Sequence, residues 1–348
     1  MSHITRFFFL LLAFAGAIQP SNAQIKSEWK SFSGDRSFSS EVLPASPGAL
    51  LSFREPDGMI LSEGNLYFTS HDAAGATVWR TSQTSIPGQE TVLYWEPGAI
   101  FSDIVFAEVD GIFWGYFFAA KLGTNFSGVM IKRIPLTGGT ASVLANVERN
   151  VHMGNHHNLV TDGENLYWQD VQAIRKMPIR GGTITSLDLG MPNTDTAGIE
   201  LQNGSLIVYA SNESIRFVPT SGTNTTPESR TIVVAEDRVT ALHAVSNGTY
   251  WGDVGPHKGN LNLRVAGVNT TLVAPRGYVT SISTKGPAAG GAQAWTECAF
   301  VINRCFLNFA RPGFKTFIVI GDGALGVTVT SSRSVFWGDI SGVHRITF

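Results

Sequence analysis

The sequence predicts an all-β fold, a seven-bladed β-propeller whose ring is closed by an N-terminal strand. Seven short aromatic-rich steps recur along the 348 residues, beginning at Tyr67, Phe113, Tyr167, Val208, Tyr250, Ala294 and Phe336. These first residues are 46, 54, 41, 42, 44 and 42 positions apart. A period of about 40–50 residues in a chain of short strands is typical of a propeller with one four-stranded blade per repeat. The 37 glycines and the low charged fraction of 15% agree with many tight turns.

The first 23 residues have the pattern of a secretory signal peptide. Arg6 precedes an apolar run of 12 residues from Phe7 to Ile18, and Ser21-Asn22-Ala23 resembles a cleavage site. A spanning helix needs about 20 apolar residues. We therefore expect a secreted or periplasmic protein with no stable membrane insertion.

The rest of the chain divides into an arm and one domain. Residues 24–46 are polar and are expected to form an N-terminal arm, and residues 47–348 a single propeller. The last repeat ends at Val343–Phe348, where a third strand is expected and no fourth can follow. Because an unpaired edge promotes aggregation, we expect the apolar segment Ala49–Phe53 to supply the missing strand and close the ring.

The clearest repeat lies between Leu159 and Leu187. Asp162-Gly163 predicts a hairpin turn, the aromatic step is Tyr167-Trp168-Gln169-Asp170, and Gly181-Gly182 predicts the next turn. This step, with Ile174-Arg175 and Pro178 after it, resembles the YWTD-type repeat of animal lipoprotein-receptor propellers and of exported bacterial propellers.

The resemblance implies structural roles for the aromatic step. Its tryptophans would pack between blades, here Trp168, Trp251 and Trp337. Its terminal acids would tie neighbouring blades together, here Asp170, Asp253 and Asp339. Receptor propellers of this type have six blades, whereas the sequence has seven repeats.

The two cysteines, Cys298 and Cys305, are expected to form a disulfide. An exported protein meets an oxidising environment, and the spacing suits a bridge across a hairpin. The alternative is a pair of buried free thiols. Redox catalysis is disfavoured because the spacing is not Cys-x-x-Cys.

The charge of the chain argues against a nucleic-acid partner. There are 25 Lys and Arg against 27 Asp and Glu, a formal net charge of −2 that becomes −3 without Arg6. No basic block is present to bind phosphates. We expect a carbohydrate or protein ligand, a monomer, and no evident cofactor.

Candidate functional residues gather in predicted loops at one mouth of the central channel. The connections between second and third strands, and between successive blades, should all end there, and loops on a rigid scaffold concentrate function. Asp103 belongs to one such connection. The predicted ligand-binding residues are His71, His152, His257, Lys258 and Asp237.

The leading hypothesis is an exported binding module whose ligand docks at this mouth. The alternative is a polysaccharide lyase or hydrolase acting on a uronate-containing glycan, because histidine is a suitable base near neutral pH. Its candidate residues are His156 and His157 as base and Arg149, Arg238 and Arg276 as carboxylate clamps. Two other interpretations stay open: the histidines are solvated loop residues, or the ring is mainly structural.

A metal site is not predicted. His152, His156 and His157 have a spacing that suits zinc only on a helix. Met153-Gly154-Asn155 argues against a helix there.

Overall fold

The computed structural model describes most of the chain after residue 40. The described residues are 41–43, 55–84, 90–121, 128–147, 158–170, 173–189, 198–211, 213–222, 231–235, 238–254, 259–273, 277–285, 292–298, 304–311, 314–322, 328–330, 334–339 and 342–347. They belong to a compact unit that spans Phe38–Phe348. The predicted signal peptide lies outside the described residues.

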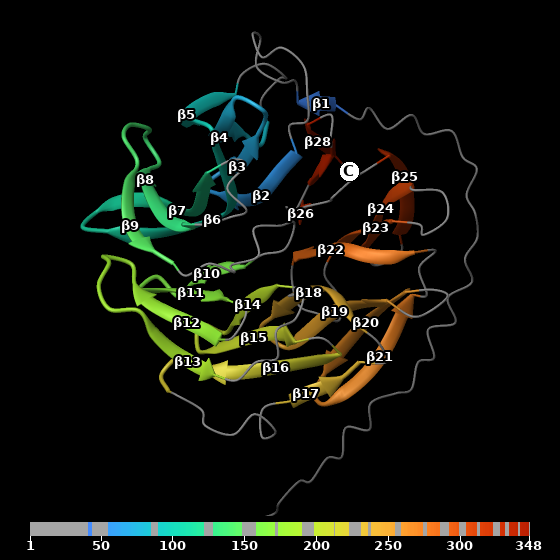
Figure 1. The fold of residues 1–348 in the computed structure, drawn as a ribbon. Helices are drawn as coiled ribbons and strands as arrows, with labels where there is room; N and C mark the ends of the chain where they lie inside the picture. Colours follow the sequence, from blue (N-terminus) through green and yellow to red (C-terminus); the bar gives the residue numbers. More distant parts are fainter. Residues whose placement is uncertain are drawn as a thin grey trace, which may run out of the picture. The chain divides into compact units, whose positions relative to one another are not determined.

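Within these residues all regular structure is β, arranged in four-stranded antiparallel sheets (Figure 1). Blade 1 contains β2 (Glu55–Ser62), β3 (Asn65–His71), β4 (Gly75–Ser82) and β5 (Thr91–Pro97). Blade 2 contains β6 (Ala99–Val109), β7 (Ile112–Lys121), β8 (Met130–Pro135) and β9 (Ser142–Asn146). Blade 3 contains β10 (Leu159–Thr161), β11 (Asn165–Gln169), β12 (Ala173–Pro178) and β13 (Thr185–Leu189).

The next three blades repeat the same order of strands. Blade 4 contains β14 (Ile199–Gln202), β15 (Leu206–Ser211), β16 (Ser214–Pro219) and β17 (Thr231–Val234). Blade 5 contains β18 (Val239–Val245), β19 (Gly248–Val254), β20 (Gly259–Val265) and β21 (Val268–Val273). Blade 6 contains β22 (Tyr278–Lys285), β23 (Ala292–Cys298), β24 (Arg304–Arg311) and β25 (Phe314–Asp322).

The remaining sheet is a composite of the two ends of the described chain. It contains β26 (Thr328–Thr330), β27 (Ser334–Asp339) and β28 (Gly342–Thr347), and β1 (Glu41–Leu43) pairs with β28 (Figure 1). The predicted count of seven blades is therefore corrected to six blades, each built from one continuous stretch, plus this composite sheet. The predicted closing strand Ala49–Phe53 is also wrong, because Glu41–Leu43 occupies the outer position; residues 49–53 lie outside the described part.

The first strand of each sheet contacts the first strand of the next. These inner strands are β2, β6, β10, β14, β18, β22 and β26, and β26 contacts β2 in turn. The chain is thus an all-β propeller in which the composite sheet lies between blades 6 and 1. Apolar layers are buried between neighbouring blades; one such cluster contains Trp168 of blade 3 and Phe118 of blade 2.

The buried tryptophans have the packing role that the sequence predicts. Trp168, Trp251 and Trp337 are all buried in the apolar clusters between sheets. For the acids, the structure shows hydrogen bonds within a blade. Asp170 accepts hydrogen bonds from Ala173 N (2.7 Å) and Arg175 Nε (2.5 Å), both in its own blade.

Asp253 likewise accepts hydrogen bonds from Asn260 and Asn262 of its own blade, and the side chain of Asp339 lies outside the described residues. Other polar side chains cross between blades. Gln169 Nε2 donates to Ala210 O at 3.2 Å, and Gln202 Nε2 donates to Val245 O at 2.7 Å. Tryptophans of the aromatic steps therefore pack between the blades, and the amides of Gln169 and Gln202 add hydrogen bonds from one blade to the next.

Blade 2 carries its aromatic step three residues later than the sequence predicts. Its third strand has a β-bulge between Ile131 and Lys132, and blade 3 has the same bulge between Ile174 and Arg175. Phe117 pairs with Lys132 as Trp168 pairs with Arg175. Tyr116 therefore begins the step, and the spacings become 49 and 51 residues in place of 46 and 54.

Candidate functional site

Four polar residues occupy β-bulges near the start of the inner strands. In blades 1, 5 and 6 one residue of the inner strand has no partner in the second strand. It lies two positions before the residue that pairs with the second aromatic-step residue, which is Phe68, Trp251 or Trp295. Blade 2 has a two-residue bulge between Ser102 and Val105. The polar residues at these bulges are Asp57, Asp103, Thr240 and Thr280. A bulge re-aims side chains out of the regular ladder, so the inner strands present polar groups where two apolar sheets would otherwise meet.

This end of the inner strands is the channel mouth. Each inner strand starts there and each second strand ends there, because neighbouring strands are antiparallel. His71 is the last residue of β3 and Asp57 lies near the start of β2. The mouth is therefore defined by the first residues of the inner strands and the last residues of their partners.

His71 and Asp57 form a hydrogen-bonded pair at the mouth. His71 Nδ1 lies 2.6 Å from Asp57 Oδ2. Asp57 is buried, whereas the side chain of His71 is partly exposed. Burial raises the pKa of Asp57 above its ordinary value, and the hydrogen bond from His71 opposes part of that rise. The carboxyl fixes the imidazole ring with one edge toward solvent.

Asp103 is the most deeply buried acid at the mouth. It is 1% exposed and adopts a left-handed conformation with φ of 52°. Its Oδ2 accepts a hydrogen bond from Asn158 N at 3.2 Å, while its buried Oδ1 accepts none from the residues that the structure describes. Burial raises the pKa of Asp103 well above its ordinary value, and the nearby charges of Asp57 and Glu200 add to the rise.

A second histidine–carboxylate pair lies further along the inner strands. His243 Nδ1 lies 3.2 Å from Glu200 Oε1, and His243 Nε2 lies 3.1 Å from Thr284 Oγ1. These residues come from β18, β14 and β22, the inner strands of three successive blades. The polar lining thus continues from the mouth into the ring.

The described groups suit recognition of hydroxyl or cationic groups. Carboxylates accept hydrogen bonds in several directions, and histidine either donates or accepts. The described residues contain no group of three or more His, Cys, Asp or Glu side chains arranged to hold a metal ion.

Most of the predicted site residues lie outside the described part of the chain. These are Arg149, His152, His156, His157, Asp237, His257, Lys258 and Arg276. His71 is at the mouth, paired with Asp57. Arg238 is exposed and directly precedes β18, so it also lies at the mouth end of blade 5.

Sequence reasoning missed Asp57, Glu200 and His243 as site residues. Asp103 was assigned to a connection, but it lies within β6. The available signal was an acid that interrupts the apolar pattern at the start of an inner strand, as in Pro56-Asp57-Gly58 and Ser102-Asp103-Ile104. Sequence shows that such residues are polar, but only the bulges show where they lie.

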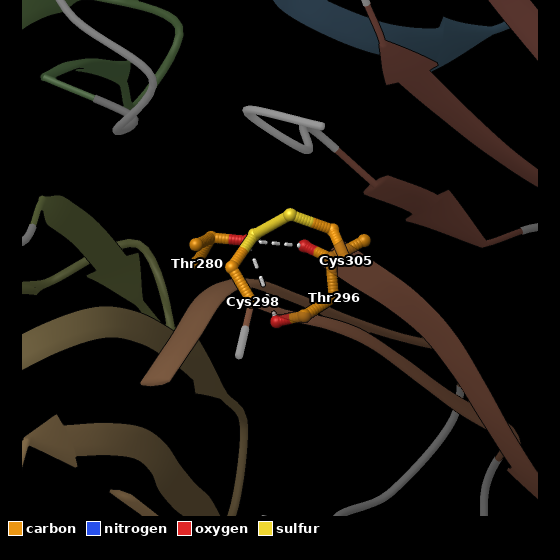
Figure 2. The surroundings of a disulfide bond; sticks show 4 residues. All are labelled: Thr280, Thr296, Cys298 and Cys305. Carbon is orange, nitrogen blue, oxygen red and sulfur yellow. Dashed lines mark hydrogen bonds between the residues drawn. A yellow bond between two sulfur atoms is a disulfide. The ribbon is translucent and has the colours of Figure 1, made fainter. Parts of the chain in front are cut away.

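The predicted disulfide is present at the same end of blade 6. Cys298 and Cys305 are directly paired residues of β23 and β24 and are joined by an S–S bond. Figure 2 shows them beside Thr280 and Thr296, whose hydroxyl oxygens lie 2.7 Å apart. The bridge therefore holds the end of the hairpin beside the bulge at Thr280.

Comparison with known proteins supports the fold and gives no family. No family model matches the sequence, and no curated protein matches it. Among solved structures, a chain of the mitotic checkpoint complex has a TM-score of 0.61 at 12% identity, over 91% of this chain and 98% of that one. The WD40 β-propeller domain of Doa1 has a TM-score of 0.58 at 13% identity, covering 89% and 97%.

A GH74 enzyme of Niastella koreensis is also similar, with a TM-score of 0.59 at 14% identity. The match covers 87% of this chain and 53% of the enzyme. At such low identity these similarities define the class of fold, a β-propeller with repeats, and leave function to the site.

Two findings bear on location. In the described part of the chain, no helix is long and apolar enough to cross a membrane. The disulfide is compatible with an extracellular location, because such bonds persist in oxidising environments.

Proposed function

We propose that the protein is an exported binding module whose ligand, a carbohydrate or a partner protein, docks at the channel mouth. The observation that carries the proposal is the His71–Asp57 pair beside the buried carboxyl of Asp103. A buried polar atom without a hydrogen-bond partner calls for a specific explanation in a native protein. A ligand or ordered water that donates a hydrogen bond toward this group supplies one.

The described acids favour a neutral or cationic ligand over a uronate. Asp57, Asp103 and Glu200 are close enough for their charges to interact. Like charges at the mouth would oppose binding of a polyanionic glycan. Of the five candidate lyase residues, only Arg238 lies in the described part, so no described contact favours the lyase.

A glycan array and a titration test the proposal. Neutral, acidic and amino-sugar glycans are screened with the full-length protein, together with basic proteins as candidate partners. We expect a neutral or cationic hit, and His71→Gln should weaken it about tenfold because a polar contact and the anchored ring are lost. Val234→Ser, on the exposed outer strand of blade 4, is the control. Binding of acidic glycans only, or equal binding by both variants, would contradict the proposal.

Export is the second part of the proposal. The signal-peptide pattern of residues 1–23 supports it, and the disulfide is compatible with it. N-terminal sequencing of the mature protein should give Gln24 as the first residue. Size-exclusion chromatography with light scattering tests the predicted monomer.

A further inference from the structure

A groove opens at the end of the blades opposite the channel mouth. It is lined by Val109, Asp110, Ile112, Trp114, Arg133 and Arg180 and has a volume of about 260 Å³. Asp110 lies in the turn between β6 and β7, and Arg180 follows β12. The first and third strands of a blade both end on the side of the ring opposite the mouth, and both turns lie on that side. This Trp114 groove is therefore separate from the mouth.

Trp114 reaches the groove because blade 2 is shifted relative to its repeat. The buried aromatic step of this blade begins at Tyr116, which leaves Trp114 only partly buried near the start of β7. The guanidinium of Arg133 lies over its indole ring, 4.5 Å from the centroid. A cation held against an aromatic face is attracted by the ring quadrupole. Trp114 and Arg133 therefore form a pre-positioned aromatic and cationic wall.

The groove lining also contains an exposed ion pair between blades 2 and 3. Arg180 donates two hydrogen bonds to the carboxylate of Asp110, at 2.6 and 2.7 Å. An exposed ion pair adds little to stability. The groove lining contains two guanidinium groups and one carboxylate, which gives it a net positive charge. Ile112 is 48% exposed at its edge.

We propose that the Trp114 groove docks a segment of a partner protein that presents a carboxylate beside an apolar side chain. Charge complementarity selects the carboxylate, since arginine binds it with paired hydrogen bonds. Ile112 and the indole edge provide the apolar contact. The volume is below the roughly 300–1,000 Å³ of small-molecule sites, which favours one or two side chains. Trp and Arg are also the residues that dominate protein–protein contacts.

A defined probe tests this docking site. A phage-displayed library of random peptides is selected on the immobilised full-length protein, and an enriched peptide is then titrated by fluorescence polarisation. We expect enriched peptides to contain Asp or Glu next to a large apolar residue. Ile112→Ser and Arg180→Gln should each weaken binding about tenfold. Asp110→Asn should strengthen it, because the competing carboxylate is lost while the fold keeps its turn.

The chain offers matched controls. Phe113 is 41% exposed but follows Ile112 on the same strand, so alternation places it on the other face of β7. Phe113→Ser should leave peptide binding unchanged. Arg264→Gln, at a partly exposed arginine of blade 5 that bonds Asn269, controls for loss of a positive charge. Unchanged thermal unfolding of Ile112→Ser shows that the fold is retained.

Three results would overturn the proposal. One is a failure of the library to enrich any peptide, or enrichment of peptides without an acidic residue. Another is weaker binding by Asp110→Asn, which indicates that the ion pair only supports the turn. The third is concentration-dependent self-association in sedimentation velocity that Ile112→Ser abolishes, which assigns the groove to a second copy of the chain.

Discussion

Gly58 and Asp103 bring the inner strands of blades 1 and 2 into direct backbone contact. A Cβ atom on Gly58 would lie 2.5 Å from Asp103 Cα. The Asp103 side chain in turn accepts a hydrogen bond from Asn158 of blade 3. Gly58 and Asp103 thus connect blades 1, 2 and 3 at the mouth. These contacts explain why an aspartate with a left-handed backbone conformation lies within β6.

Gly58→Ala should destabilise the protein strongly. The added methyl group meets backbone atoms rather than a flexible side chain, and overpacking of this kind costs about 1–3 kcal/mol or more. Urea unfolding followed by fluorescence measures the loss. Gly222→Ala is the control, because a Cβ at Gly222 meets no atom within 4 Å. Equal stability of the two variants would contradict the close contact.

Asp103→Asn should change how stability depends on pH. The folded state raises the pKa of Asp103 above the unfolded value of about 3.9, so it holds the proton more tightly. Stability from this group is complete below the unfolded pKa and is lost as pH rises toward the folded pKa. Asparagine does not titrate, so the variant does not lose stability between the unfolded and folded pKa values of Asp103. In this pH range its stability relative to the parent should rise by up to about 1.4 kcal/mol per pH unit.

Asp110→Asn should change the pH dependence of stability in the opposite direction. The Arg180 guanidinium beside Asp110 holds the pKa of that exposed carboxyl below its ordinary value. Stability from this pair is present above the unfolded pKa and is lost as pH falls through the folded one. Urea unfolding between about pH 2 and 8 measures both variants, because the Asp110 transition lies below the ordinary carboxyl pKa of about 3.9. A difference between parent and Asp103→Asn that is independent of pH would show that Asp103 is not perturbed by burial.

Among the strands, the recurring bulge is what gives the blades their common register. It lies between Val78 and Trp79 in blade 1 and between Ile215 and Arg216 in blade 4, as in blades 2 and 3. A bulge increases local twist, which turns the outer strand away from a flat edge. This recurring twist protects outer strands that carry few charges, such as β9 and β17.

The disulfide is the covalent element of blade 6, and its removal should lower stability. Cys298 and Cys305 enclose a loop of eight residues, counting both ends. The chain-entropy relation gives about 2.5 kcal/mol for a loop of this length. The double variant Cys298→Ser/Cys305→Ser should therefore unfold at lower urea concentration than the parent. Parent protein with and without reductant is the comparison, and identical midpoints would contradict a stabilising bridge.

For the whole molecule, closure of the ring depends on the short strand β1. Its three residues pair with Val343, His344 and Arg345 of β28. Arg345 also donates to Gln83 O of blade 1. The composite sheet is therefore joined to both its own N-terminal strand and the first blade.

Removal of β1 should expose the edge of β28. A chain that begins at Pro44 should unfold at a lower temperature and aggregate more readily, because unpaired strand edges template association. A chain that begins at Phe38 keeps β1 and is the control. Differential scanning calorimetry and light scattering measure both. Equal behaviour of the two truncations would show that β1 does not stabilise the ring.

Three features could be predicted from the sequence: the all-β propeller, the disulfide and the packing role of the tryptophans. Each of these depends on local pattern: a period of aromatic steps, two cysteines at hairpin spacing, and large apolar side chains that must be buried. Fewer residues of the candidate site could be predicted from local sequence pattern. Of its residues, His71 was identified, while Asp57, Glu200 and His243 were not.

Three other features depend on contacts between distant parts of the chain: the register of blade 2, the strand that closes the composite sheet, and the polar groups at the mouth. Trp114 and Phe117 are equally apolar in sequence, and only pairing with β8 shows which one is buried. Glu41–Leu43 is a closing strand solely because β28 lies beside it. Asp57 and Asp103 meet through bulges in different blades. Such features arise from contacts between residues far apart in the chain, which local periodicity does not encode.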